Sequence, residues 1–150
     1  MATEANTLIQ RAELDPASAR CVIVLDDALP PGLAANAAAV LAVTLGARAP
    51  GVLGPDIDDA DGGRHPGLID RGLPILKAPG PELNGLRARA LAVDVLVVGF
   101  LRFGQATTDY EAYREQVGQT PAGELDYLGL LLSGPQKTVN KLTGSLPLLR

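Results

Sequence analysis

The segment that most constrains the fold of this chain is residues 21–46, CVIVLDDALPPGLAANAAAVLAVTLG. It begins with a short, β-branched apolar run, which is typical of a buried strand. Two aspartates and a Pro-Pro-Gly turn follow, and then an Ala-rich stretch predicts a helix that ends near Gly46. Ligands of open α/β sheets bind where strands reach their carboxyl ends, so this turn is the first place to expect a site.

The rest of the chain continues the alternation of strands and helices. Residues 51–72 interrupt it with a Gly-, Pro- and Asp-rich excursion that predicts a small exposed hairpin. The order predicts an α/β fold on a four-stranded, mixed or mainly parallel sheet flanked by helices. The further predicted elements occupy residues 73–78 (strand), 79–92 (helix), 94–100 (strand), 107–117 (helix), 127–132 (strand) and 134–142 (helix).

The length and composition predict a single domain and limit its partners. A chain of 150 residues predicts one α/β domain at residues 20–150, preceded by an arm or short helix at residues 1–19. No apolar run resembles a signal peptide or a membrane span, so we expect a cytoplasmic protein without a membrane partner. The net charge of −4 argues against a nucleic-acid partner, which needs a basic surface.

Few residues of this chain could hold a metal or a cofactor. The single cysteine, Cys21, and the single histidine, His65, exclude an internal disulfide and a Cys/His zinc cluster. Cys21 is best interpreted as a buried small apolar residue. The chain contains no Gly-x-Gly-x-x-Gly after its first strand and no Walker A sequence. We therefore expect no metal and no cofactor.

Two segments resemble a known family. The opening CVIVLDDALPPGLAANAAAVLA resembles the first strand and helix of peptidyl-tRNA hydrolase II, and LPILKAP resembles its second strand. The closing SGPQKTVNKLTGSLPLLR resembles that family's Gly-Pro, helix, Thr-Gly, Leu-Leu signature. Over about residues 20–150 the chain most resembles an uncharacterised bacterial branch of this fold, the domain of unknown function 2000. The resemblance implies a peptidyl-tRNA hydrolase II-like fold.

The resemblance does not extend to the hydrolase's reaction. The family's first helix carries a Lys-x-Ala-Ala-Gln pattern, and aligning it with Ala34-Ala35-Asn36 places Gly32 where the essential lysine stands. Ala39 occupies a position where the family often has a histidine. The family's Asp-x-Gly-x-Thr loop has no clean counterpart in this chain. The resemblance therefore implies the fold, but this chain lacks the lysine on which the hydrolase's reaction depends.

Three residues are candidates for catalysis. Asp26 and Asp27 end the first strand, where a carboxylate pair could supply acid and base; alternatively they form a solvated turn or cap the next helix. His65 has an unperturbed pKa near neutrality, which makes it the best general-base candidate. The alternative for His65 is an ordinary histidine in a surface loop.

Three further residues are candidates for binding a substrate. Asn36 lies on the otherwise apolar first helix, where it could bind a substrate amide or carbonyl or could satisfy loop backbone groups. Arg102 and Gln105 follow the third strand and could orient a carboxylate or amide of the substrate. The alternative is that both side chains are solvated in a loop and that the helix after this loop is capped. If the strands are parallel, Arg102 and Gln105 share the sheet edge of the first turn.

These residues lead to three hypotheses about function. The first is a hydrolase-like enzyme of unassigned activity that acts on a small amide or ester. The alternative is a non-catalytic binding or interaction module that forms a homodimer. Genuine peptidyl-tRNA hydrolysis comes third, because Gly32 replaces the lysine and the chain is acidic.

Overall fold

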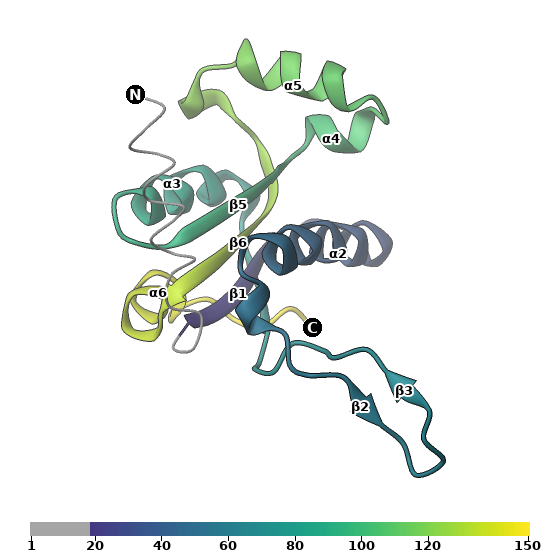
Figure 1. The fold of residues 1–150 in the computed structure, drawn as a ribbon. Helices are drawn as coiled ribbons and strands as arrows, with labels where there is room; N and C mark the ends of the chain where they lie inside the picture. The colour runs from purple at the N-terminus through teal and green to yellow at the C-terminus, as the bar shows by residue number, and fades with distance from the viewer. Residues whose placement is uncertain (1–18) are drawn as a thin grey trace.

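A four-stranded mixed sheet organises residues 19–150, the part of the chain that the computed structural model describes (Figure 1). The predicted arm lies outside the described residues except for Ala19, which begins the first strand. The sheet has the order β4-β1-β6-β5, with β1 and β4 parallel and β6 antiparallel to both of its neighbours. The four strands are β1 (Ala19–Asp26), β4 (Ile75–Ala78), β5 (Leu96–Leu101) and β6 (Tyr127–Pro135).

The direction of β6 makes the sheet mixed rather than mainly parallel. A parallel return from β5 would need a crossover along a face of the sheet. The helices between β5 and β6 instead lie beyond the end of the sheet, so the chain turns back antiparallel (Figure 1). These helices are α4 (Phe103–Ala106) and α5 (Tyr110–Gly118), followed by the 3-10 turn η3 (Ala122–Glu124).

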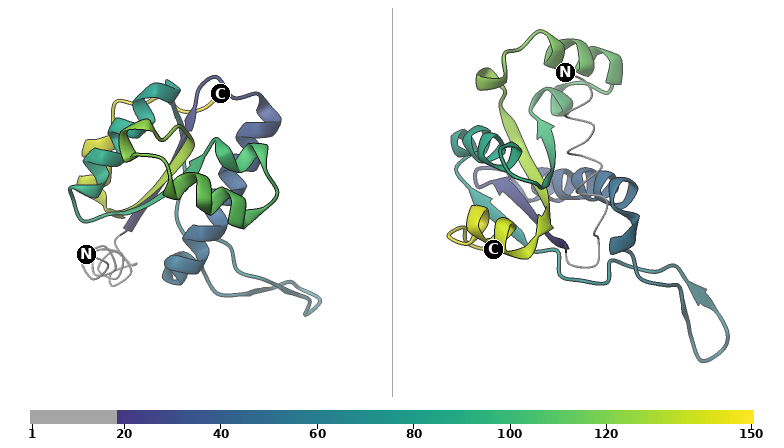
Figure 2. Two further views of the ribbon diagram at one scale, coloured as in Figure 1. Left: turned by 90° about the horizontal axis from the view of Figure 1, so that it is seen from above. Right: turned by 60° about the vertical axis from the view of Figure 1, so that its left-hand side comes forward.

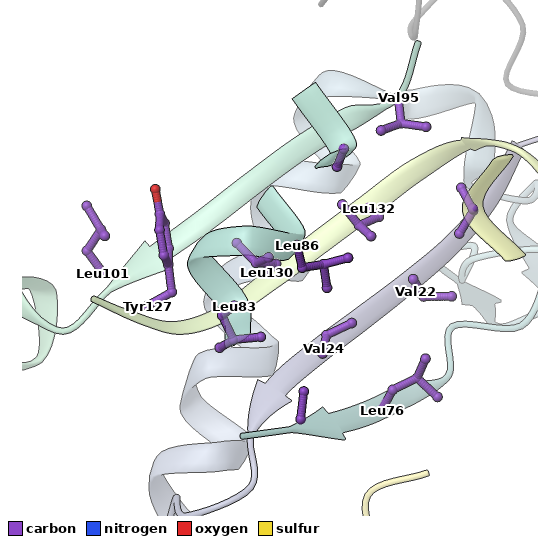
Figure 3. Packing of buried hydrophobic residues seen from close by; sticks show 13 residues of the cluster. Val22, Val24, Leu76, Leu83, Leu86, Val95, Leu101, Tyr127, Leu130 and Leu132 are labelled. Carbon is purple, nitrogen blue, oxygen red and sulfur yellow. The ribbon is translucent and has the colours of Figure 1, made fainter. Parts of the chain in front are cut away.

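Helices cover both faces of the sheet because β1 is apolar on both sides. Its odd-numbered residues, such as Ile23, pack in one core cluster with α2 (Pro31–Arg48). Its even-numbered residues, Val22 and Val24, pack in the other cluster with α3 (Gly80–Leu91) and α6 (Gln136–Thr143) (Figure 3). This period of two is the geometry of a strand that is buried on both faces.

Two helices begin later than the sequence predicts. The helix predicted from residue 107 begins at Tyr110, because Asp109 is its N-cap and accepts hydrogen bonds from the N–H groups of Glu111 and Ala112. The final helix begins at Gln136, because β6 continues as a buried strand to Gly134 before Pro135 ends it. The first turn of α6 therefore follows the end of β6 directly.

The predicted hairpin is present and projects away from the sheet (Figures 1 and 2). After the 3-10 turn η2 (Pro50–Val52), β2 (Ile57–Asp58) pairs antiparallel with β3 (Arg64–His65). Gly62 has a φ of +82°, the left-handed region that glycine adopts without a steric cost. Oδ1 of Asp59 accepts hydrogen bonds from the N–H groups of Asp61 and Gly63, which closes the turn.

The two edges of the sheet differ. On the β4 edge, the Lys77 N–H donates to the Pro147 carbonyl at 2.9 Å, and the Leu149 N–H donates to the Ile75 carbonyl at 2.8 Å. The closing segment thus satisfies part of this edge. On the β5 edge, no strand of residues 19–150 pairs with the outer side of β5.

None of the helices within residues 19–150 is long and apolar enough to cross a bilayer.

Candidate functional site

An ion pair joins the carboxyl ends of β1 and β5, the first and third strands of the sheet in chain order. β1 and β5 run in the same direction on either side of β6, so their carboxyl ends lie at the same end of the sheet. There Nη2 of Arg102 donates to Oδ2 of Asp26 at 3.0 Å. Nε of Arg102 donates to Oδ2 of Asp126 at 2.7 Å. One guanidinium therefore links the ends of β1 and β5 to the segment that leads into β6.

Asp26 is buried in this arrangement. Its side chain is 8% exposed, and its Oδ1 accepts a hydrogen bond from the Ala28 N–H at 2.9 Å. The first residue of α3 packs directly on the carboxylate: a Cβ on Gly80 would lie 2.6 Å from Oδ2. The partial positive charge at a helix N-terminus favours a carboxylate there. Asp26 is therefore not part of a solvated turn, whereas the exposed Asp27 is.

The two carboxylates keep Arg102 cationic. The hydrogen bond with Asp126 is the largest cause that raises the pKa of the Arg102 guanidinium; burial opposes it, and the hydrogen bond with Asp26 adds to it. Arginine is charged at all physiological pH values even without this help. The result is a fixed positive charge at the carboxyl ends of β1 and β5, which offsets part of the negative charge of Asp26 and Asp126.

A recess of about 510 Å³ opens beside this pair. Asp26, Arg102 and Asp126 line it together with Gly80 and Asn84. Nδ2 of Asn84 donates to the carbonyls of Ala122 and Leu125, at 2.7 and 2.9 Å, so it holds the loop that precedes β6. Among the described residues, no Ser, Cys, His or Lys side chain lines the recess. Its groups can bind a polar or cationic ligand, but they include no ready nucleophile.

The other predicted site residues lie elsewhere. Asn36 is exposed on α2 and Gln105 is exposed on α4, and neither lines the recess. His65 lies on the projecting hairpin, where its Nε2 is 2.8 Å from Oδ2 of Asp59. Of the predicted residues, the structure brings together Asp26 and Arg102, with Asp27 adjacent in the chain. Catalytic and substrate-binding roles for all six residues stay predictions.

The contact between His65 and Asp59 is electrostatic and exposed. The hydrogen bond from His65 is the largest cause that lowers the pKa of Asp59, and the N–H groups of Gly63 and Asp61 lower it further. The His65 side chain is 63% exposed. This pair therefore stabilises the turn of the hairpin, and solvent surrounds it.

An apolar groove that the sequence analysis did not predict lies on the opposite side of β5. It has a volume of about 390 Å³ and runs between α2, the end of β5, and α4 with α5. Its walls include Val40 and Thr44 from α2, Phe100 from β5, and Tyr110 and Tyr113 from α5. Two tyrosines and several aliphatic side chains in one groove provide an apolar surface with polar tips.

The exposed face of α2 continues this apolar surface. Leu33 is 36% exposed, Val40 41% and Val43 74%. Surface helices normally present charged residues to solvent, and a helix that is apolar all round is normally buried. Residues 31–47 contain no charged side chain, and Arg48 is the first charge in α2. This absence of charge is the signal that could have predicted the surface, which we name the α2 surface: Leu33, Asn36, Val40, Val43 and the adjacent groove.

The described residues offer no metal site, and Cys21 has a structural role. Within the part of the chain that the structure describes, no three His, Cys, Asp or Glu side chains are grouped so that they could hold a metal ion. Cys21 is fully buried, as predicted, and its Sγ lies 3.3 Å from Oγ of Ser133. It packs in the core between β1 and β6.

The family model of a protein of unknown function, DUF2000, matches residues 19–150. The chain belongs to the DUF2000 family. A solved structure of a protein of unknown function from Agrobacterium tumefaciens strain C58 is similar to it with a TM-score of 0.82 and 20% sequence identity. The similarity covers 89% of this chain and 98% of that chain. No curated protein matches the chain.

This DUF2000 protein thus has two surfaces to consider. The polar recess holds a buried carboxylate, a fixed guanidinium and no nucleophile. The α2 surface holds exposed aliphatic and aromatic side chains; residues 31–47 of α2 carry no charge, and Asp109 is the one charged residue among the described residues that line the groove. At 20% identity the structural similarity shows the fold alone.

Proposed function

We propose that this DUF2000 protein is a non-catalytic interaction module that forms a homodimer through its α2 surface. The observation that carries the proposal is the exposed, uncharged outer face of α2, where Val43 is 74% exposed. Burial of such aliphatic side chains is favourable by about 25 cal/mol per Å² of apolar surface. An apolar helix face of this kind is what an interface between subunits requires.

A second copy of the chain is the occupant that the charge pattern favours. In a two-fold interface the same patch meets itself, so side chains near the axis face their own kind. A charged face would place like charges opposite each other, but residues 31–47 carry none. Asn36, the polar residue at the centre of this face, can both donate and accept a hydrogen bond across such an axis.

The experiment is a measurement of mass in solution over a range of protein concentrations. We expect a concentration-dependent dimer by sedimentation equilibrium, and we expect Val43→Glu to weaken dimerisation at least about tenfold, because it would bury a charge in the interface. Ala88→Glu adds the same charge to an exposed position of α3 and should leave the dimer unchanged. A wild-type protein that stays monomeric, or equal effects of the two variants, would contradict the proposal.

A second candidate is a hydrolase-like activity on a small amide or ester, which the recess beside Asp26 and Arg102 supports. Arg102, which lines the recess, would bind a carbonyl or carboxylate oxygen. Asp27, which is exposed and follows Asp26 in the chain but lies outside the lining of the recess, would act on water. Its test is turnover of a panel of p-nitrophenyl esters and amino-acid amides by the wild-type protein and by Asp27→Asn. Turnover that Asp27→Asn abolishes would support the activity, and a wild-type protein without turnover would remove it.

We also infer a fold of the peptidyl-tRNA hydrolase II type, on the support of the closing motif at residues 133–150. Peptidyl-tRNA hydrolysis itself remains the third hypothesis, since Gly32 stands at the lysine position. An assay with peptidyl-tRNA tests it directly. Turnover there would displace the interaction module as the proposed function.

A further inference from the structure

A third cavity, of about 660 Å³, lies at the opposite end of the sheet from the Asp26–Arg102 pair. It is lined by residues from the start of β1 and from the passage of β6 into α6, two segments that lie side by side in the sheet (Figure 1). The antiparallel register pairs Arg20 with Gly134, two residues before the first turn of α6. Topology therefore brings the side chain of Arg20 and the start of α6 to the walls of one cavity.

The lining of this cavity is cationic. Arg20, Arg71 and Lys137 line it, and Asp70 is the one carboxylate among its lining residues from the described part of the chain. Nε of Arg71 donates to Oδ1 of Asp70 at 2.8 Å, and Nη1 of Arg71 donates to the Ala19 carbonyl at 2.9 Å. Among the described residues of this lining, three cations and one carboxylate concentrate positive charge on an otherwise acidic protein.

Arg20 carries an unsatisfied hydrogen-bond donor. Its Nε is shielded from solvent and has no hydrogen-bond partner in the structure of residues 19–150. A buried donor without an acceptor costs free energy, more so when it is charged. An anion in the cavity would provide acceptor oxygens for this guanidinium.

The first turn of α6 adds to the positive potential. No side chain among residues 19–150 caps this helix, and no acidic residue lies in its first turn. Lys137 is its second residue, where the helix dipole disfavours a cation. An anion at this end would accept hydrogen bonds from the first N–H groups of α6, offset the dipole and pair with Lys137.

We propose that this cavity is a binding site for the phosphate group of a small molecule, separate from the α2 surface. A phosphate provides several acceptor oxygens and up to two negative charges, which match the guanidinium of Arg20, the ammonium of Lys137 and the first N–H groups of α6. The volume leaves room for an organic group attached to the phosphate. Arg71 completes the cationic wall at the corner with Ala19.

The test is a titration of the full chain with inorganic phosphate at constant ionic strength, followed by ³¹P NMR and by the amide resonances of residues 136–138. We expect saturable binding that shifts these amides. Lys137→Gln should weaken binding about tenfold, the effect of losing one charge-assisted hydrogen bond. Lys141→Gln removes the same charge one turn further along α6, outside the lining, and should change binding less than about twofold.

Arg20→Gln removes the guanidinium whose Nε has no partner among the described residues, and Arg20→Lys keeps its charge if the first variant fails to fold. Either variant should weaken phosphate binding more than Lys141→Gln does. Absence of saturable binding to the wild-type protein would overturn the proposal. Equal weakening by Lys137→Gln and Lys141→Gln would also overturn it, because it would show only general attraction between charges.

Discussion

Nη2 of Arg102 lies 3.0 Å from Oδ2 of Asp26, although 76 residues separate the two in the chain. The bond joins the carboxyl ends of β1 and β5, which are not neighbours in the sheet. It gives the buried carboxylate of Asp26 a counter-charge at the protein surface, where Arg102 remains 43% exposed. The carboxyl edge of the sheet is thus held together by one guanidinium.

Removal of this guanidinium should destabilise the fold. Arg102→Gln leaves the Asp26 carboxylate buried with the Ala28 N–H as its remaining hydrogen-bond partner among the described residues, and we expect the free energy of unfolding to fall by about 1–2 kcal/mol. Asp126→Asn alters the other, exposed arm of the same guanidinium and should cost about 0.5 kcal/mol or less. Urea unfolding measures both values. A larger loss in Asp126→Asn than in Arg102→Gln would show that Asp26 does not depend on the pair.

Two glycines of α3 should respond to alanine with opposite signs. A Cβ at Gly80 would lie 2.6 Å from Oδ2 of Asp26, so Gly80→Ala should cost about 1–3 kcal/mol through the displaced carboxylate. At Gly85 a Cβ would meet Nη1 of Arg89 at an ordinary 3.6 Å, so Gly85→Ala should stabilise the helix by about 0.5–1 kcal/mol. Thermal unfolding distinguishes these outcomes. Stabilisation by both substitutions would mean that α3 can move away from Asp26.

The N-cap of α5 should contribute measurably to stability. Asp109 accepts from the N–H groups of Glu111 and Ala112, and Asp109→Ala should reduce the free energy of unfolding by about 1 kcal/mol. Thr108→Ala alters the adjacent exposed residue, which makes no cap hydrogen bond, and serves as the control. Chemical denaturation of the two variants provides the comparison. Equal stabilities would indicate that α5 does not need its cap.

Acid should weaken the turn of the β2–β3 hairpin. The pKa of Asp59 is lowered in the folded chain, chiefly by His65, so its contribution to stability is present above the ordinary carboxyl pKa and is lost as the pH falls through the lowered one. His65→Gln should raise the pKa of Asp59 towards its ordinary value, as a ¹³C NMR titration of the carboxyl group would show. Arg64→Gln removes the neighbouring partner of Asp58 and should leave the pKa of Asp59 unchanged. A pKa that is the same in all three proteins would contradict the assigned contact.

The elements with the clearest local patterns were the predictable ones. The apolar run of β1, with Asp26 at its end, and the Gly-rich hairpin are readable because their signals are local. Arg102 meets Asp26 because β1 and β5 end at the same sheet edge, which the alternating order of elements already favoured. The resemblance to the domain of unknown function 2000, predicted over about residues 20–150, was confirmed by the family model, which matches residues 19–150.

Properties that depend on tertiary placement were not predictable. The direction of β6 depends on whether α4 and α5 cross a face of the sheet or lie beyond its end. The composition of the chain does not indicate which of these two arrangements occurs. The sequence predicts a substrate-binding role for Asn36 on the first helix, but the rotation of α2 buries Ala34 and Ala37 and turns Asn36 to solvent. The cationic cavity needed the register that pairs Arg20 with Gly134, which no local signal specifies.

The central position of β6 has a consequence for biosynthesis. β1 and β5 do not touch each other in the sheet order; each is hydrogen-bonded to β6, the last of the four strands to leave the ribosome. Until residues 127–135 have been synthesised, β5 has no partner among the strands of the sheet, and one edge of β1 is open. The nascent chain therefore carries two apolar strands with unpaired edges until β6 is complete, and such edges are the sites at which incomplete chains associate with one another.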